Sequence, residues 1–182
     1  MKNPNLSFDP LNKGDIVDLV LPASSCTKQE YEASIDFINS LGLKARVPKY
    51  DELVNEAEIF CSNTAKYRFN HLYEAIKAKD SKAIWCIKGG YGSAKLLSFF
   101  AKADINKIRK LFIGFSDITM LLNYFIAKKT DLVCIHGPMT GQIARSEVSA
   151  GAIDKIKNII FGQIEKIEID RLFALNLSLI HI

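Results

Sequence analysis

Two glycine-bearing corners hold the residues of this chain whose types are best suited to chemistry. One is Lys88-Gly-Gly-Tyr-Gly92, and the other, further along the chain, is Gly114-Phe-Ser-Asp117. Each corner follows a short apolar run and precedes apolar residues at helical spacing, the pattern of a strand that turns into a helix. The hydroxyl of Ser116 becomes a nucleophile when a base takes its proton, and flexible backbone nearby can supply amides to an oxyanion. Together the corners indicate an active site of which this chain holds a part.

Taken singly, each corner also has a purely structural interpretation. A serine between a strand and a helix is typical of an N-cap. Asp117, in the first turn of a helix, is stabilised by the helix dipole without any further role. The glycines of the first corner are typical of a tight turn at positive φ. Ile118 replaces the second glycine of a Gly-x-Ser-x-Gly elbow, and the first corner has neither phosphate-loop residues nor the dinucleotide-binding spacing.

The elements around the corners alternate between strand and helix. Thr27 and Glu30 form a capping box at the start of a helix that Gly42 ends. Residues 49–63 are polar and unpatterned, which predicts a loop. Repeated strand–helix units imply a flavodoxin-like α/β fold, a parallel sheet with helices on both faces, whose carboxyl edge binds ligands. Strands are predicted at 16–21, 43–47, 83–87, 110–114, 132–135 and 164–173, and further helices at 64–79 and 146–161.

The composition fits an ordinary α/β domain of a reducing compartment. The chain has 182 residues, of which 48% are hydrophobic, enough to bury a core. Its net charge of +4 comes from scattered lysines, which argues against nucleic-acid binding. The four cysteines show neither metal-ligand nor redox spacing, and the N-terminus lacks the apolar segment of a signal peptide. Since no segment has the long uncharged run of a membrane span, we expect a cytoplasmic protein.

Three motifs in a fixed order carry a resemblance to a known family. They are Lys88–Leu97, Phe112–Thr119 and His136-Gly-Pro-Met139, and Arg68 precedes them on a predicted helix. Over nearly its whole length the chain resembles the LD-carboxypeptidase family of serine peptidases, also called muramoyltetrapeptide carboxypeptidases. The microcin C resistance peptidases are their relatives. The first motif begins with lysine where the family usually has arginine, and Phe115 stands where it usually has tyrosine.

The resemblance implies catalytic roles at both corners. Ser116 corresponds to the family nucleophile, and the amide of Asp117, together with that of Gly89 or Gly90, corresponds to the oxyanion hole. The family's base is a histidine oriented by a glutamate, and both come from a second, C-terminal domain. The resemblance therefore implies that the triad is incomplete in this chain. No metal and no organic cofactor are expected, because serine, histidine and glutamate suffice.

Substrate contacts are expected from residues beside the corners. Tyr91 lies between two glycines on a turn that we expect to be exposed, and we assign it, with Gly92, to the substrate cleft. His136, at the end of a predicted strand, is expected to shape the pocket rather than to act as the triad base. Of the other histidines, His71 is expected on the surface of a helix, and His181 belongs to the C-terminal tail.

These features predict one half of a two-domain serine carboxypeptidase. Residues 1–165 are expected to form the N-terminal nucleophile domain, and residues 166–176 the start of a linker to a C-terminal domain outside the chain. Residues 177–182 also match the translation of a transposon end used in sequencing libraries, which makes them a candidate non-native tail. A native C-terminal strand is the alternative for these residues.

The reaction implied by the resemblance is hydrolysis of the L,D-peptide bond before the terminal D-alanine of a murein tetrapeptide, during cell-wall recycling. The bond joins that D-alanine to the L-centre of diaminopimelate or lysine. Within the same class, the alternative is a microcin C resistance-type peptidase, which cleaves a peptidyl-nucleotide amide. The alternative from another class is a non-catalytic binding domain that uses the same cleft. The expected partner is a murein peptide, not nucleic acid or a membrane, and a homodimer is left open.

Overall fold

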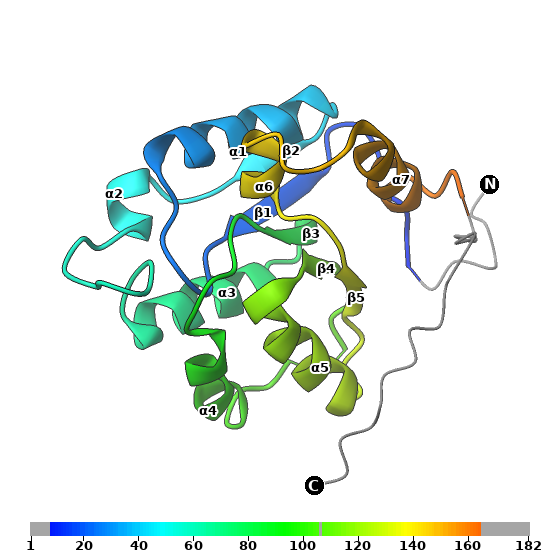
Figure 1. Ribbon diagram of the computed structural model, residues 1–182. Coiled ribbons are helices and arrows are strands. Elements are labelled where there is room, and N and C mark those ends of the chain that lie inside the picture. Colours follow the sequence, from blue (N-terminus) through cyan, green and yellow to red (C-terminus); the bar gives the residue numbers. More distant parts are fainter. Residues whose placement is uncertain (1–7, 106, 165–182) are drawn as a thin grey trace, which may run out of the picture.

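A five-stranded parallel sheet forms the centre of the computed structural model, which describes residues 8–105 and 107–164 (Figure 1). The strand order is β2-β1-β3-β4-β5, and every neighbouring pair is parallel. This order is that of the flavodoxin-like doubly wound fold, so the predicted fold class is confirmed. The strands are β1 (Ile16–Val20), β2 (Lys44–Arg46), β3 (Ser81–Cys86), β4 (Leu111–Gly114) and β5 (Val133–His136).

Helices cover both faces of the sheet (Figure 1). Successive strand residues point to opposite faces, so β3 gives Ile84 to one core and Trp85 to the other. Each core therefore joins one face of the sheet to the apolar residues of the helices that cover it, and α2 (Tyr50–Leu53) adds Leu53 to the second core. The first face carries α3 (Ala65–Lys77), α4 (Leu97–Phe100) and α5 (Thr119–Ala127), and the second carries α1 (Lys28–Ser40), α6 (Thr140–Ala144) and α7 (Ala150–Ile160).

Helix α1 begins and ends where its sequence predicts. The Thr27 hydroxyl accepts a hydrogen bond from the Glu30 amide at 3.1 Å, and the Glu30 carboxylate accepts one from the Thr27 amide at 2.7 Å. The capping box is therefore confirmed. Gly42 follows the end of the helix with φ +77°, the left-handed conformation that suits glycine at this position.

Two short helices lie where the sequence analysis placed none. The segment 49–63 is not wholly a loop, because α2 (Tyr50–Leu53) forms in it and buries Leu53. Helix α6 was also missed, and α7 begins at Ala150, after its N-cap Ser149, rather than at residue 146. Both missed helices are too short for their apolar residues to repeat at helical spacing.

Several expectations fall outside the described residues. These are the sixth predicted strand beyond Ile164, the linker at 166–176, the tail at 177–182 and its His181. Within the described part of the chain, no helix is both long enough and apolar enough to cross a membrane.

Candidate active site

The two glycine-bearing corners meet at the carboxyl edge of the sheet. Strands β3 and β4 are neighbours, and Trp85 pairs with Ile113 in their parallel register. The chain therefore leaves both strands at the same edge. A Cβ built on Gly89 would lie 3.4 Å from the Cβ of Ser116 and 3.4 Å from the carbonyl oxygen of Phe115. The predicted meeting of the two corners at one edge is confirmed.

Ser116 is exposed and has a backbone conformation that L-residues rarely adopt. Its φ is +58°, which costs about 1–2 kcal/mol for a residue with a Cβ. It is the first residue of a 3₁₀ turn, η2 (Ser116–Ile118), whose N-cap is Phe115, and α5 has Ile118 as its N-cap. Ser116 is thus not the N-cap of either element. Strain of this kind is typical of functional turns, including the elbow that exposes a nucleophile.

The first corner offers backbone donors close to the serine. Among the described residues, the amides of Gly89 and Gly90 donate no hydrogen bond to a protein acceptor. The Gly89 carbonyl accepts a hydrogen bond from the Ser24 amide at 3.0 Å. Free amides near a nucleophile are what an oxyanion hole requires. The role of these amides, and of the Asp117 amide, stays a prediction.

Asp117 links the two corners through hydrogen bonds. Its carboxylate accepts a hydrogen bond from the Ser93 amide at 2.8 Å, and its carbonyl accepts one from the Ser93 hydroxyl at 2.6 Å. Ser93 is fully buried and begins the 3₁₀ turn η1 (Ser93–Leu96) after the glycines. Asp117 therefore has a structural role, in addition to the favourable interaction of its charge with the helix dipole. Sequence reasoning missed Ser93, because nothing local distinguishes it from other helix-starting serines.

A buried arginine holds the glycine turn in place through hydrogen bonds to backbone carbonyls. Arg68, on α3, donates to the carbonyls of Gly92 at 2.9 Å, Pro22 at 2.5 Å and Asn63 at 2.9 Å. Burial lowers the pKa of this guanidinium from its ordinary value. Gly92 has φ +113°, and a Cβ there would lie 2.6 Å from the Cys61 sulfur and 3.2 Å from Arg68. Gly92 thus shapes the turn as a backbone element, and its assignment to substrate binding stays a prediction.

Tyr91 projects from the turn as expected, and an aromatic residue that the analysis missed lies beside it. Tyr91 is 55% exposed and Phe60 is 71% exposed, and their ring centroids are 6.4 Å apart. The Ser24 hydroxyl donates to the Phe60 carbonyl at 2.8 Å and accepts from the Tyr91 amide at 3.0 Å. A single hydroxyl therefore holds both backbones together. The apolar pair Ile59-Phe60 inside a polar segment was the available signal.

The two histidines in the described part of the chain, His71 and His136, lie in different surroundings. His136 pairs with Gly114 in the sheet register, is exposed, and has its ring 5.9 Å from the ring of Phe115. It thus lies beside the serine corner, lining a cavity of about 360 Å³. His71 is half-buried rather than on the open surface, and lines a different cavity with Asp18. Burial lowers the pKa of His71 to about 4.

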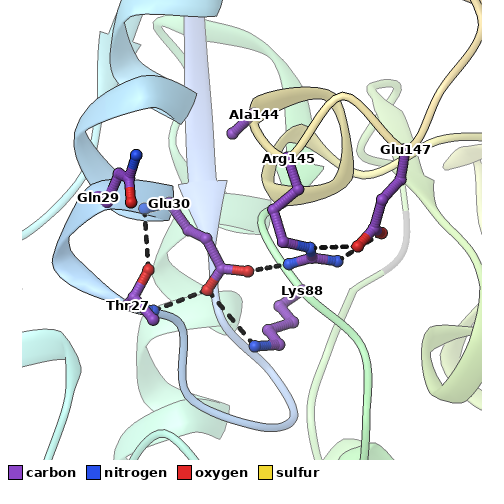
Figure 2. A pocket seen from close by; sticks show the side chains of 7 residues that line it. All are labelled: Thr27, Gln29, Glu30, Lys88, Ala144, Arg145 and Glu147. Carbon is purple, nitrogen blue, oxygen red and sulfur yellow. Dashed lines mark hydrogen bonds and ion pairs between the residues drawn. The ribbon is translucent and has the colours of Figure 1, made fainter.

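A charged pocket adjoins the first corner on the side of α1 and α6 (Figure 2). The buried Glu30 carboxylate is paired with Arg145, and Lys88 Nζ lies 3.4 Å from Glu30 Oε2. Arg145 also forms a two-pronged pair with Glu147, through Nε at 2.6 Å and Nη2 at 2.8 Å. This pair holds the pKa of the Glu147 carboxyl below its ordinary value. Of these residues, sequence analysis named Lys88 in the first motif and Glu30 only as part of the capping box, and it missed Arg145 and Glu147.

The fold and the site define a doubly wound α/β domain whose candidate site lies at the carboxyl edge of the sheet, built from a strained serine and a glycine turn. A sequence profile of the LD-carboxypeptidase N-terminal domain matches residues 17–137. The chain therefore belongs to the LD-carboxypeptidase family, as its motifs predicted.

Individual relatives agree with this assignment. The murein tetrapeptide carboxypeptidase of Pseudomonas aeruginosa is 31% identical over 136 residues, which are 74% of this chain and 42% of that protein. A protein of Rickettsia prowazekii named as a carboxypeptidase is 29% identical over 154 residues, 84% of this chain and 48% of its own. The crystal structure of an MccF-like protein from Bacillus anthracis superimposes with a TM-score of 0.71 at 27% identity, covering 83% of this chain and 46% of that one. The chain thus spans less than half the length of these relatives.

Proposed function

We propose that this chain is the nucleophile-bearing half of a serine carboxypeptidase that releases the terminal D-alanine of a murein tetrapeptide in cell-wall recycling. The observation that carries the proposal is Ser116, which is exposed at positive φ and lies beside Gly89; within the described part of the chain, the amides of Gly89 and Gly90 donate no hydrogen bond. Backbone strain is typical of functional sites, exposure lets the substrate reach the hydroxyl, and nearby donors can stabilise the oxyanion once a base has activated the serine. The similarity to a murein tetrapeptide carboxypeptidase supports the substrate class.

In the proposed reaction, Ser116 Oγ attacks the carbonyl carbon of the bond before D-alanine while a base takes its proton. The amides of Asp117 and of Gly89 or Gly90 stabilise the oxyanion. The protonated base then gives its proton to the leaving amine of D-alanine, and water hydrolyses the acyl-enzyme. The base and the residue that orients it are proposed to come from a second domain outside this chain.

The test uses the gene extended to the length of its relatives. Ser116→Ala is expected to lower D-alanine release by several orders of magnitude while the protein still folds, because the nucleophile is lost. Ser98→Ala, an exposed serine on α4, is the matched control and is expected to keep wild-type turnover. Near-normal release by Ser116→Ala would contradict the proposal.

A peptidase of the microcin C resistance type is the second candidate. Two observations favour it: the likeness to an MccF-like structure, and the exposed Tyr91–Phe60 pair, since aromatic rings can stack on a nucleobase. Comparing kcat/KM for a murein tetrapeptide and for a peptidyl-nucleotide amide decides between the two. If the extended protein binds one of them and hydrolyses neither, the non-catalytic binding domain is supported instead.

A further inference from the structure

Ser24 continues the hydrogen-bond ladder between β1 and β3 beyond the ends of both strands. Val20 pairs with Cys86 at the last position of the parallel register, and counting equally far along each chain brings Ser24 opposite Gly90. A residue in a parallel ladder bonds, through its N–H and its C=O, to the two residues that flank its partner. Ser24 forms the first of these bonds in the usual way, because its amide donates to the Gly89 carbonyl at 3.0 Å.

The second bond of the ladder is made by the Ser24 side chain instead of its carbonyl. The Tyr91 amide donates to Ser24 Oγ at 3.0 Å. The hydroxyl donates its own proton to the Phe60 carbonyl at 2.8 Å, which leaves its lone pairs for Tyr91. The segment of Phe60 is itself bonded to the end of β1, since the Ser62 amide donates to the Ala23 carbonyl at 2.9 Å. The hydroxyl is therefore held in a fixed direction on the β1 side of the glycine turn.

This arrangement requires glycine at position 90. Gly90 has φ +98°, and a Cβ there would lie 2.4 Å from Ser24 Oγ and 2.7 Å from Ser24 Cβ. Both the backbone conformation and the close contact exclude a side chain. Because the glycine lets Ser24 approach so closely, one serine can bond to both residues that flank Gly90.

Covalent geometry then sets the direction of the two polar groups of Gly90. The peptide bonds of the described residues are trans, and in a planar trans peptide the C=O and N–H groups point in opposite directions. Because the Gly89 carbonyl and the Tyr91 amide both point to Ser24, the amide and the carbonyl of Gly90 point away from it. Since β3 lies between β1 and β4 in the sheet, that direction is the side of β4 and of Ser116, which follows β4.

Both polar groups of Gly90 are open to a ligand. Among the described residues, its amide donates no hydrogen bond and its carbonyl accepts none, and Gly90 is exposed. Strand β4 ends at Gly114, so within the described part of the chain no strand continues beside Gly90 on this side. An N–H and a C=O left free at a strand edge are the groups with which a sheet binds an extended peptide.

We propose that Ser24 is a positioning residue of the candidate active site. It takes the place of a strand partner on one side of the glycine turn, and so keeps the amide and the carbonyl of Gly90 directed toward the substrate on the other side. The amide then meets the oxyanion, and the carbonyl accepts a hydrogen bond from a main-chain N–H of the substrate. This inference rests on the proposed function and deepens it, because it gives the Ser24 hydroxyl and the Gly90 carbonyl roles that the proposed reaction leaves open.

The first test measures the kinetics of the enzyme extended to the length of its relatives. Ser24→Ala is expected to lower kcat at least about tenfold and to change KM less than about threefold, because a misplaced oxyanion donor weakens the transition state more than the ground state. Ser25→Ala is the matched control and is expected to keep wild-type kcat. Ser25 is half-buried, and its side chain forms no hydrogen bond with the described residues.

Three kinetic results would overturn the inference. The first is a kcat of Ser24→Ala within about twofold of the wild-type value. The second is a rise in KM at unchanged kcat, which would mean that Ser24 acts on ground-state binding alone. The third is an equal loss of kcat in Ser25→Ala, which would mean that any change in this segment disturbs the site.

The second test needs no turnover and uses the 182-residue chain. Amide hydrogen exchange followed by NMR reports on the Tyr91 amide, whose acceptor is Ser24 Oγ. Its exchange is expected to quicken at least about tenfold in Ser24→Ala and to stay unchanged in Ser25→Ala. Unchanged exchange of Tyr91 in Ser24→Ala would refute the positioning role, whatever the activity of the extended protein. The proposed function fails separately, if the extended wild-type protein releases no D-alanine while the exchange rates change as expected.

Discussion

At the scale of single residues, Ser116 keeps a strained backbone because its neighbours fix it on both sides. Gly114 permits the sharp bend, since a Cβ there would lie 2.7 Å from Ile118. Asp117 is held by both of its hydrogen bonds to Ser93. The N-cap of η2 is Phe115, which forms no side-chain capping bond, and Ser116 is the first residue of the turn itself. Ser116 therefore does not stand in the N-cap position, which favours the nucleophile hypothesis over the N-cap interpretation.

Ser116→Ala is expected to change the free energy of unfolding of this chain by less than about 0.5 kcal/mol, as for exposed side chains without a structural bond. Thr27→Ala is the matched control, because Thr27 is a true N-cap whose hydroxyl accepts from Glu30. It is expected to lose about 1 kcal/mol. Urea denaturation followed by circular dichroism measures both. Equal losses in the two variants would restore the N-cap interpretation of Ser116.

Some residues near the candidate site could be named from the sequence and others could not, because different contacts bring them to the site. Ser116 and Gly89 stand at the ends of apolar strands, and parallel pairing alone brings such positions together. Ser93, Phe60 and Arg145 reach the site through side-chain contacts with segments distant in the sequence. Short-range patterning holds no information on the contacts of Ser93 and Arg145, whereas Phe60 stands out as part of the apolar pair Ile59-Phe60 in a polar segment. The meeting of the first group was therefore predictable, and of the second group only Phe60 had a signal in the sequence.

At the scale of elements, α3 stabilises the candidate site through the hydrogen bonds of Arg68. Arg68 reaches from this helix to the carbonyls of Pro22, after β1, and Gly92, after β3, and to that of Asn63 just before α3 itself. Hydrogen bonds to a charged group are about twice as strong as neutral ones. The glycine turn therefore depends on a helix that contributes nothing to the chemistry.

Arg68→Met is expected to destabilise the chain by about 2–5 kcal/mol, because it leaves buried carbonyls without donors. Lys77→Met, an exposed cation in the last turn of the same helix, is the control and is expected to cost less than about 0.5 kcal/mol. Urea unfolding gives both values. A small loss for Arg68→Met would mean that water or neighbouring groups replace the guanidinium.

The elements also show the limits of periodicity. The capped helix α1 and the apolar strand β3 were predicted close to their observed bounds. Each is long enough for its apolar residues to show the spacing of a helix or of a buried strand. Helices α2 and α6 have only four and five residues. Helix α6 forms where Gly141 packs against the end of β3, a tertiary contact that its own sequence does not reveal.

At the scale of the whole molecule, His71 makes stability depend on pH. Its pKa falls from 6.5 to about 4 on folding, because desolvation outweighs the attraction of Asp18. The unfolded chain therefore binds the proton more readily. The contribution of neutral His71 is complete above the unfolded pKa and is lost as the pH falls through 6.5 toward about 4.

His71→Gln is expected to flatten the acid side of the stability profile. Between about pH 7 and about pH 4.5, the wild-type chain should lose on the order of 1–3 kcal/mol more unfolding free energy than the variant. Urea titrations at a series of pH values measure the difference. Parallel profiles for the two proteins would show that His71 titrates normally in the folded chain.

The last prediction concerns the activity of the 182-residue chain on its own. We expect no D-alanine release from a murein tetrapeptide, because a neutral serine without a base attacks amides poorly. His71 lines a different cavity, and His136 lies beside the serine corner with its ring 5.9 Å from that of Phe115. Adding the downstream half found in full-length relatives is expected to restore turnover. Release by the purified chain, abolished by His136→Ala, would instead make His136 the base and the chain a complete catalyst.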